Sequence, residues 1–201
     1  MSGALPLRVK KQMYMHKTIT GQSKDRFQMP RKMLRQKLRL IGEYMQVEIR
    51  PIKNNETTRL KEFLYEAIYI PEGVKAPQKD IIERPELRVY TDDFGTKQGD
   101  NCFVAVVDNQ IVGAVWTRIM NDYGHVDNDT PSFAVSLYKD YRSQGIGTKL
   151  MKKMLSLLKI QGYKKASLAV QKANYALSMY EKVGFHTVDE NEEEYIMVCE
   201  L

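Results

Sequence analysis

The residues best suited to carry chemistry lie in one short stretch, Tyr141–Thr148, which reads YRSQGIGT. Its two glycines let the backbone turn sharply and come close to a ligand. An apolar segment with helical spacing follows, and the free N–H groups and the dipole at the start of a helix favour an anion. Arg142 adds a fixed positive charge. The stretch therefore predicts a cradle for a pyrophosphate, although two glycines at the start of a helix can also serve only as a turn.

Two well-known phosphate-binding motifs are excluded by their spacing. A P-loop needs glycine, four residues and then Gly-Lys-Ser/Thr, and the chain has no such pattern. A dinucleotide-binding fingerprint needs a third glycine three residues after the second, and that position is Leu150. The remaining pattern, Arg-x-x-Gly-x-Gly, says little alone, so its meaning depends on the elements around it.

The elements around this stretch form a strand, a helix and a second strand. The hydrophobic pattern predicts strands over 132–137 and 165–170 and a helix over 145–160. A strand, helix and strand within about 40 residues form a βαβ crossover, which makes the two strands parallel. Alternate residues of the first strand, from Ser132 to Ser136, are small, so we expect another element to pack closely against that face.

The remaining segments predict a single mixed α/β sheet over residues 46–201, with strands dominating the first part and the βαβ unit the second. The other predicted elements are a strand over 46–50, a helix over 56–69 capped by Asn55, a lid or loop over 71–99, a hairpin over 102–118, a polar loop over 121–130, a helix over 173–182 capped by Asn174 and a final hairpin over 185–201.

The positive charge is concentrated at the start of the chain. Residues 1–45 hold eleven Lys or Arg and two acids, a net +9, while the whole chain carries +6, so the remainder carries −3. We therefore expect nucleic-acid binding only through this extension, in which 31–44 has the pattern of a basic amphipathic helix. With two cysteines, Cys102 and Cys199, and no apolar run of about 18 residues, the chain is expected to be cytoplasmic, without a membrane span or a metal site.

Two matched motifs resemble one family. The segment Leu137–Gly147, followed by Asn174–Phe185 (NYALSMYEKVGF), closely resembles the GNAT superfamily of acyl-CoA-dependent N-acetyltransferases. The resemblance covers roughly 46–201 and departs at Lys139, where the family often has Pro, and at Ser143, where it often has Gly. It implies a GNAT-like single domain with a central, mostly antiparallel mixed sheet, one parallel βαβ unit and helices on both faces.

The resemblance also implies an acetyl-CoA co-substrate and the residues that would hold it. The strand that carries Val135 would pair by its backbone with the pantetheine arm, where it splays from its parallel neighbour. Asn174 would contact the cofactor near that gap, and Tyr180 matches the general acid of the family. Alone on an amphipathic helix, Tyr180 would more often be a packing residue. The residues implied to bind acetyl-CoA are Val135, Ser136, Leu137, Arg142, Gln144, Gly145, Ile146, Gly147, Thr148 and Asn174.

The acceptor is less defined than the donor. The expected reaction is direct attack of a primary amine, from a small molecule or a protein, on the thioester in a ternary complex. Candidates for the general base are Asp122, His125, Asp127 and Glu83, each of which could equally be a solvated loop residue. A non-catalytic acyl-CoA-binding regulatory module is the alternative function. The family resemblance also allows a homodimer through an exposed strand edge or the final hairpin.

Overall fold

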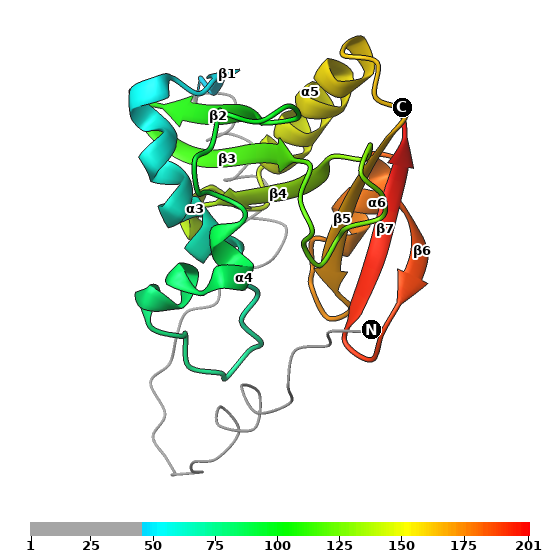
Figure 1. Cartoon of the computed structure of the whole chain (residues 1–201). Helices are drawn as coiled ribbons and strands as arrows, with labels where there is room; N and C mark the ends of the chain where they lie inside the picture. The colour runs from blue at the N-terminus through cyan, green and yellow to red at the C-terminus, as the bar shows by residue number, and fades with distance from the viewer. Residues whose placement is uncertain (1–45) are drawn as a thin grey trace, which may run out of the picture.

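A computed structural model describes residues 46–201 of the chain (Figure 1). The extension 1–45, the basic helix expected within it and its boundary with the domain lie outside the described residues. No helix within 46–201 has both the length and the apolar character needed to cross a membrane.

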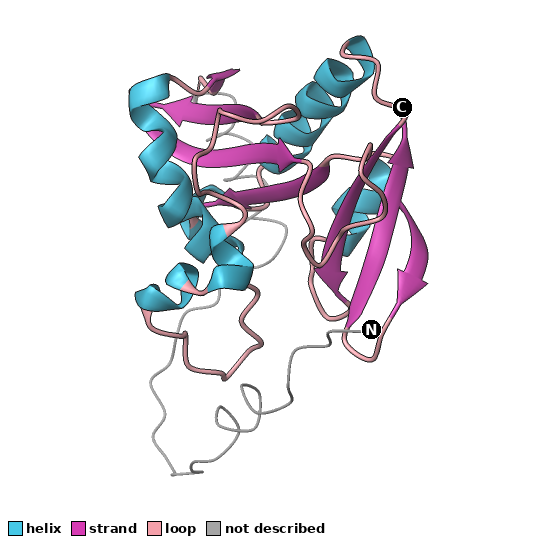
Figure 2. Ribbon diagram, in the orientation of Figure 1, coloured by secondary structure: helices cyan, strands magenta, loops and turns pink. Residues whose placement is uncertain are grey.

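One seven-stranded sheet forms the centre of the domain, in the order β1-β2-β3-β4-β5-β7-β6 (Figures 1 and 2). All neighbouring strands are antiparallel except β4 and β5, so the predicted mixed sheet with one parallel pair is confirmed. The strands are β1 (Glu48–Pro51), β2 (Asn101–Val107), β3 (Gln110–Arg118), β4 (Ser132–Leu137), β5 (Lys165–Gln171), β6 (His186–Glu190) and β7 (Glu194–Glu200).

The parallel pair is the place where the sheet opens. β4 and β5 are paired only at Ser132 and Ser167, whereas β5 stays paired with β7 from Lys165 to Gln171. Beyond the Ser132–Ser167 contact, β4 and β5 separate toward the carboxyl end of β4. The sheet therefore contains a wedge-shaped gap, with its narrow end at these two serines.

Helices cover both faces of the sheet (Figure 1). On one face, α3 (Leu60–Ala67) packs on a core around Val104 and Trp116. On the other face, α5 (Ile146–Ile160) and α6 (Leu177–Lys182) pack on a core that includes Phe133. The small face of β4 meets α3, because Ser136 Oγ donates a hydrogen bond of 2.7 Å to the carbonyl of Phe63. The close packing predicted for that face is confirmed.

Two predicted helices differ in their boundaries, and one predicted lid or loop contains helices. The first begins as a 3-10 helix, η1 (Asn54–Arg59), and Asn55 is not its cap, because the Glu56 carboxylate accepts the Lys53 N–H at 2.9 Å. The last begins at Leu177 rather than at 173, since Asn174 forms a turn before it. The segment predicted as a lid or loop holds two short helices, η2 (Lys79–Glu83) and α4 (Pro85–Arg88), and Pro85 starts the second.

Candidate active site

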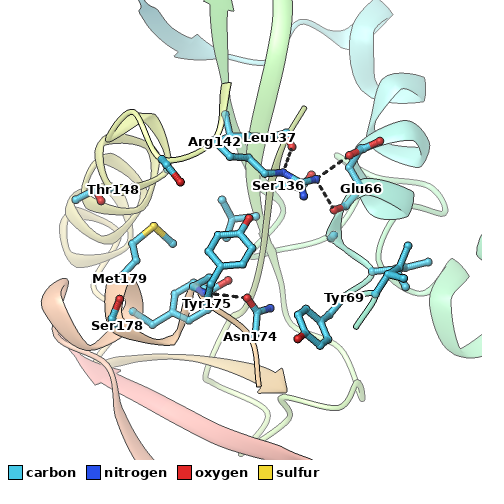
Figure 3. Close-up of a pocket in the computed structure, with 18 of the residues that line it drawn as sticks. Glu66, Tyr69, Ser136, Leu137, Arg142, Thr148, Asn174, Tyr175, Ser178 and Met179 are labelled. Carbon is cyan, nitrogen blue, oxygen red and sulfur yellow. Dashed lines mark hydrogen bonds and ion pairs between the residues drawn. The ribbon is translucent and has the colours of Figure 1, made fainter. Parts of the chain in front are cut away.

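A cleft of about 670 Å³ lies where the gap between β4 and β5 meets the ends of three helices (Figure 3). Its walls are the end of α3 with the loop after it, the end of β4, the start of α5, and α6 with the loop before it. The lining includes Glu66, Tyr69, Glu72, Val135, Ser136, Leu137, Arg142, Gly145, Gly147, Thr148, Asn174, Tyr175, Met179 and Tyr180.

The start of α5 forms one wall and is arranged to receive an anion. Gly145 precedes the helix with φ +79°, a backbone conformation that L side chains rarely adopt, and a Cβ placed there would meet no atom within 4 Å. The helix is 15 residues long and has no acidic residue in its first turn. Its free N–H groups and its dipole therefore present positive partial charge to the cleft.

Gly147 has a different task from Gly145. A Cβ on Gly147 would lie 3.1 Å from Met179 Sδ, so the missing side chain lets α6 come close to the first turn of α5. Figure 3 shows Thr148 and Met179 together on this side of the cleft. Gly145 thus allows the backbone turn that starts α5, and Gly147 allows α6 to pack closely against α5.

Arg142 is already engaged in the structure. Its Nε donates to the carbonyl of Leu137 at 2.8 Å, and its Nη2 pairs with Glu66 Oε2 at 2.7 Å, with both side chains about 30% exposed. The guanidinium thereby ties the end of β4 to α3 (Figure 3). Its charge at the cleft is partly balanced by Glu66, a residue without any motif in the sequence.

The edge of β4 presents unpaired backbone to the gap. The Ser167 N–H donates to the carbonyl of Pro131 at 3.0 Å, which sets the side of β4 that faces β5. Because alternate residues point their backbone groups to the same edge, the N–H and C=O of Val135 also face the gap, beyond the last paired residue. An extended chain could pair with that edge as an added strand would.

Asn174 and Tyr69 lie together at the end of the cleft away from Arg142 (Figure 3). The side-chain oxygen of Asn174 accepts the Ala176 N–H at 2.9 Å, and its carbonyl accepts the Leu177 N–H at 3.1 Å, so it shapes the turn into α6. The Tyr69 hydroxyl donates to the carbonyl of Ala173 at 2.9 Å. That bond joins the loop after α3 to the loop before α6, and Figure 3 shows Tyr69 and Asn174 close together on this side of the cleft. Sequence reasoning missed Tyr69, which carries no spacing signal.

Tyr180 lines the cleft from α6 and is 9% exposed. Its ring packs against Phe185, with the two centroids 6.3 Å apart. Burial raises the pKa of the Tyr180 phenol, and the nearby Tyr175 adds to the increase. The hydroxyl therefore stays protonated well above neutral pH and can donate a proton.

Several residues predicted for the site do not line the cleft. Glu83 pairs with Lys61 at 2.8 Å on the surface, and the His125 ring nitrogen Nδ1 lies 3.0 Å from the carbonyl of Met120. Asp127 accepts the Asp129 N–H in an exposed loop, and Asp122 is bonded to Tyr90 and Ser132. The carboxylates that do line the cleft, Glu66 and Glu72, were not among the predicted bases.

Two residues of the glycine motif contribute no side chain to the lining. Gln144 Nε2 donates to the carbonyl of Asp140 at 2.7 Å, and Ile146 is buried in the core. Both can act at the cleft only through their backbone N–H groups. Cys102 and Cys199 are buried, as expected of small core residues. Within 46–201, no three His, Cys, Asp or Glu side chains gather closely enough to hold a metal ion.

Solved structures with the same architecture are plentiful. The PaiA N-acetyltransferase from Thermoplasma acidophilum, in complex with coenzyme A, aligns with a TM-score of 0.60 and 20% identity over 78% of this chain and 100% of that one. The ribosomal-protein-S18-alanine N-acetyltransferase from Escherichia coli aligns with a TM-score of 0.54 and 16% identity over 77% of this chain and 94% of that one. At these identities the likeness establishes the fold.

Sequence relatives give the same grouping. The N-alpha-acetyltransferase of Saccharolobus solfataricus is 32% identical over 95 residues, 43% of this chain and 56% of that protein. N-alpha-acetyltransferase 30 of Schizosaccharomyces pombe is 30% identical over 124 residues, 60% of this chain and 80% of that protein. A ribosomal protein bS18-alanine N-acetyltransferase of Haemophilus influenzae is 30% identical over 84 residues, 42% of this chain and 53% of that protein.

The matches therefore span little more than half of two of these three relatives. A family model described as an acetyltransferase (GNAT) domain matches residues 66–197, which include all the elements around the cleft except the first part of α3. The chain therefore belongs to the GNAT family of acetyltransferases.

Proposed function

We propose that this protein transfers an acetyl group from acetyl-CoA to a primary amine, and that the acceptor is the α-amino group of a peptide or protein. The observation that carries the proposal is the convergence of three features on one cleft: the open start of α5, the unpaired edge of β4 and the buried Tyr180. The names of the sequence relatives, two N-alpha-acetyltransferases and one ribosomal protein bS18-alanine N-acetyltransferase, support the choice of acceptor.

The residues present fit the donor. The pyrophosphate would lie on the backbone N–H groups from Gln144 to Thr148, where the helix end supplies donors and Gly145 leaves open space. The pantetheine arm would follow the unpaired edge of β4 at Val135. Arg142 would add charge once its pairing with Glu66 is loosened or shared. Acetyl-CoA itself would supply an activated thioester carbonyl.

Two groups of this chain would act on that thioester. Tyr180 would protonate the leaving sulfur, because its raised pKa keeps the phenol in its acid form at neutral pH. A backbone N–H of the opened β4 edge, that of Val135, would hydrogen-bond the carbonyl oxygen as charge develops on it. With these two groups the amine can attack the thioester directly, without a covalent acetyl-enzyme intermediate.

The charge of the domain supports a cationic acceptor. Outside the basic extension 1–45 the chain carries a net −3. Two of its carboxylates line the cleft near the loop that follows α3: Glu72, and Glu66, which is paired with Arg142. Such a field attracts an ammonium group and raises its local concentration.

The proposal is tested by thiol release from acetyl-CoA with three acceptors. These are a short peptide with a free N-terminal alanine and no lysine, the same peptide with a blocked N-terminus and one lysine, and spermidine. We expect turnover with the free N-terminus and at least about 100-fold less with Tyr180→Phe. Turnover with only spermidine or only the lysine peptide would show that the acceptor is not an α-amino group. Tight binding of acetyl-CoA without turnover for any amine would favour the non-catalytic binding module.

A further inference from the structure

The gap between β4 and β5 also has a face on the side of α3. Directly paired residues of parallel strands point to the same face of a sheet, so the side chains of Ser132 and Ser167 lie together at the narrow end of the gap. Ser136, four residues after Ser132, points to the same side and bonds to α3. These serines therefore mark the face opposite α5 and α6.

A short loop, 122–124, closes the narrow end of the gap on this face. A Cβ placed on Gly124 would lie 2.9 Å from the backbone nitrogen of Ala169, from the carbonyl carbon of Leu168 and from Ser132 Oγ. Only a glycine allows the loop to press so closely on β5, at the point where β5 leaves β4. The side chain of Asp122 is held at this point.

Asp122 has one satisfied and one unsatisfied oxygen. Oδ2 accepts hydrogen bonds from the Tyr90 hydroxyl at 2.8 Å and from Ser132 Oγ at 2.7 Å. Oδ1 is buried and receives no hydrogen bond of good geometry from residues 46–201, although the backbone amides of Asp122 and Gly124 lie near the carboxylate. Ser167 Oγ, also buried, is unpartnered in the same part of the structure. Two buried polar atoms without a hydrogen-bond partner, at one end of a gap, indicate a place where a polar ligand could bind.

Tyr180 lies on the other face of the sheet, where Phe185 connects it to the start of β4. Phe133, next to Ser132 and pointing the opposite way, packs on Phe185 with centroids 5.6 Å apart, and Phe185 in turn packs on Tyr180. The acid on α6 and the carboxylate on the loop therefore lie on opposite faces of the sheet.

We propose that Asp122 accepts the proton of the acceptor amine, which reaches the gap from the face that carries α3 and α4. This inference rests on the proposed acetyl transfer and adds to it the entry side of the acceptor and the group that deprotonates it. Asp122 would be the proton acceptor on one face and Tyr180 the proton donor on the other.

The proton and electron balance is complete with these two groups. The acceptor ammonium gives one proton to Asp122, directly or through a water molecule, and its nitrogen lone pair forms the bond to the acetyl carbon. The carbon–sulfur bond breaks, and the sulfur takes the electron pair and a proton from Tyr180. The second nitrogen proton returns to the Tyr180 phenolate, and Asp122 then releases its proton to solvent.

The groups around Asp122 tune its proton affinity. Burial raises the pKa of its carboxyl group, while the hydrogen bonds from Ser132 and Tyr90 lower it, and the net direction is upward. Tyr90 lies within the electrostatic reach of Tyr123 and of Glu194 at the start of β7. The charges of Glu86 and Arg84, on the side of α4, in turn act on the pKa of Tyr123. The neighbouring charges are thus mainly negative, as suits the approach of a cation.

The test compares three variants of the full chain by the pH dependence of kcat/KM, with the N-terminal alanine peptide as acceptor. Asp122→Asn removes the base but keeps the shape. Tyr90→Phe keeps the base but removes one hydrogen bond to it. Asp129→Asn makes the same chemical change as the first variant on the exposed part of the same loop and serves as the control. Melting temperature and the Kd for CoA are measured for each.

We expect Asp122→Asn to lose about 100-fold or more in kcat/KM near neutral pH and to recover part of it at high pH, where the amine is already neutral. Its Kd for CoA should stay within about twofold of the wild-type value, as for a local change outside the cleft. Tyr90→Phe moves the acid limb of the profile to higher pH, because the carboxyl group has lost a bond that favours its charged form. The amine is the same for every enzyme, so a displaced limb reports a group of the protein.

Unchanged profiles for both variants, with wild-type turnover intact, would overturn the inference and leave the acetyl transfer standing. A loss of kcat/KM by Asp122→Asn that is equal at all pH values, with no displaced limb in Tyr90→Phe, would show a purely structural loop and would also overturn it. Failure of the wild type to acetylate any amine would instead count against the proposed function.

Discussion

Two glycines at opposite ends of α5 separate the effect of backbone shape from that of anion binding. Gly145 precedes the helix with φ +79°, Gly162 follows it with φ +89°, and a Cβ on either would meet no atom within 4 Å. Gly145 lines the cleft, whereas Gly162 lies at the far end of the helix, about 25 Å away at the usual rise per residue. Replacing each by Glu gives a matched pair.

The two variants should lose similar stability. An L residue in the left-handed region costs about 1–2 kcal/mol, which corresponds to a fall in Tm of about 2–8 °C for a domain of this size. The helix dipole favours a carboxylate at the start of α5 and disfavours one at its end. Gly162→Glu should therefore be the less stable of the two variants.

Their affinities for CoA should differ sharply. A carboxylate at Gly145 would stand about 5 Å from a pyrophosphate bound at the start of α5, which gives a repulsion of about 2–4 kcal/mol, or about 30- to 1000-fold in Kd. At the far end of the helix the same charge is beyond two Debye lengths and should change Kd by less than about twofold at physiological salt.

The assay is calorimetric titration of CoA into each variant, with thermal unfolding followed in parallel. We expect saturable binding by the wild type and Gly162→Glu, and strongly weakened binding by Gly145→Glu at a comparable Tm. Equal affinity in all three proteins would refute the reasoning, because the glycine motif would then be only a turn at the start of a helix.

Three further results follow from the contacts described above. Tyr180→Phe should lower kcat by about 100-fold without changing the Kd for CoA. Because burial raises the pKa of Tyr180, the pH profile of the wild-type kcat should show no alkaline limb from this residue below about pH 10, and an earlier limb that vanishes in the variant would contradict this. Glu66→Gln should tighten CoA binding by about threefold to tenfold at low salt, since it frees the charge of Arg142, and weaker binding measured by titration would show that the pair acts mainly as a strut. Asp100→Asn should cost about 3 kcal/mol in the free energy of unfolding measured with denaturant, because Arg118, 1% exposed like its partner, would lose its counter-ion. Burial raises the pKa of Asp100, but the bond from Arg118 and the N–H groups of its loop outweigh that effect and lower it. The stabilisation is therefore present above about pH 4 and lost as pH falls through the lowered value, so the variant should show a flatter acid unfolding profile than the wild type.

The βαβ unit was predictable because its information is local. Alternation in 132–137, helical spacing in 145–160 and the glycines between them each fix a short-range geometry. The small face of β4 even indicated close packing, which Ser136 and Phe63 provide. The motif resemblance then supplied the expected positions of the cradle and Tyr180.

The rest of the cleft could not be predicted from local pattern. Glu66 and Tyr69 reach the cleft because α3 packs across β4, about 70 residues further along the chain, and neither residue has a spacing that marks it. Asp122 was a candidate base by residue type alone. Its significance depends on Gly124 pressing against β5, a contact that no periodicity reveals. The same limit explains the candidates Glu83 and His125, which the fold places outside the cleft lining.

The most direct test of the central claim is mass spectrometry of a peptide that carries both an N-terminal alanine and one lysine, after incubation with acetyl-CoA and the protein. The account predicts a single acetyl group on the α-nitrogen, with one thiol released for each modified peptide. An unmodified peptide and no thiol release, from a folded protein that binds acetyl-CoA, would contradict it.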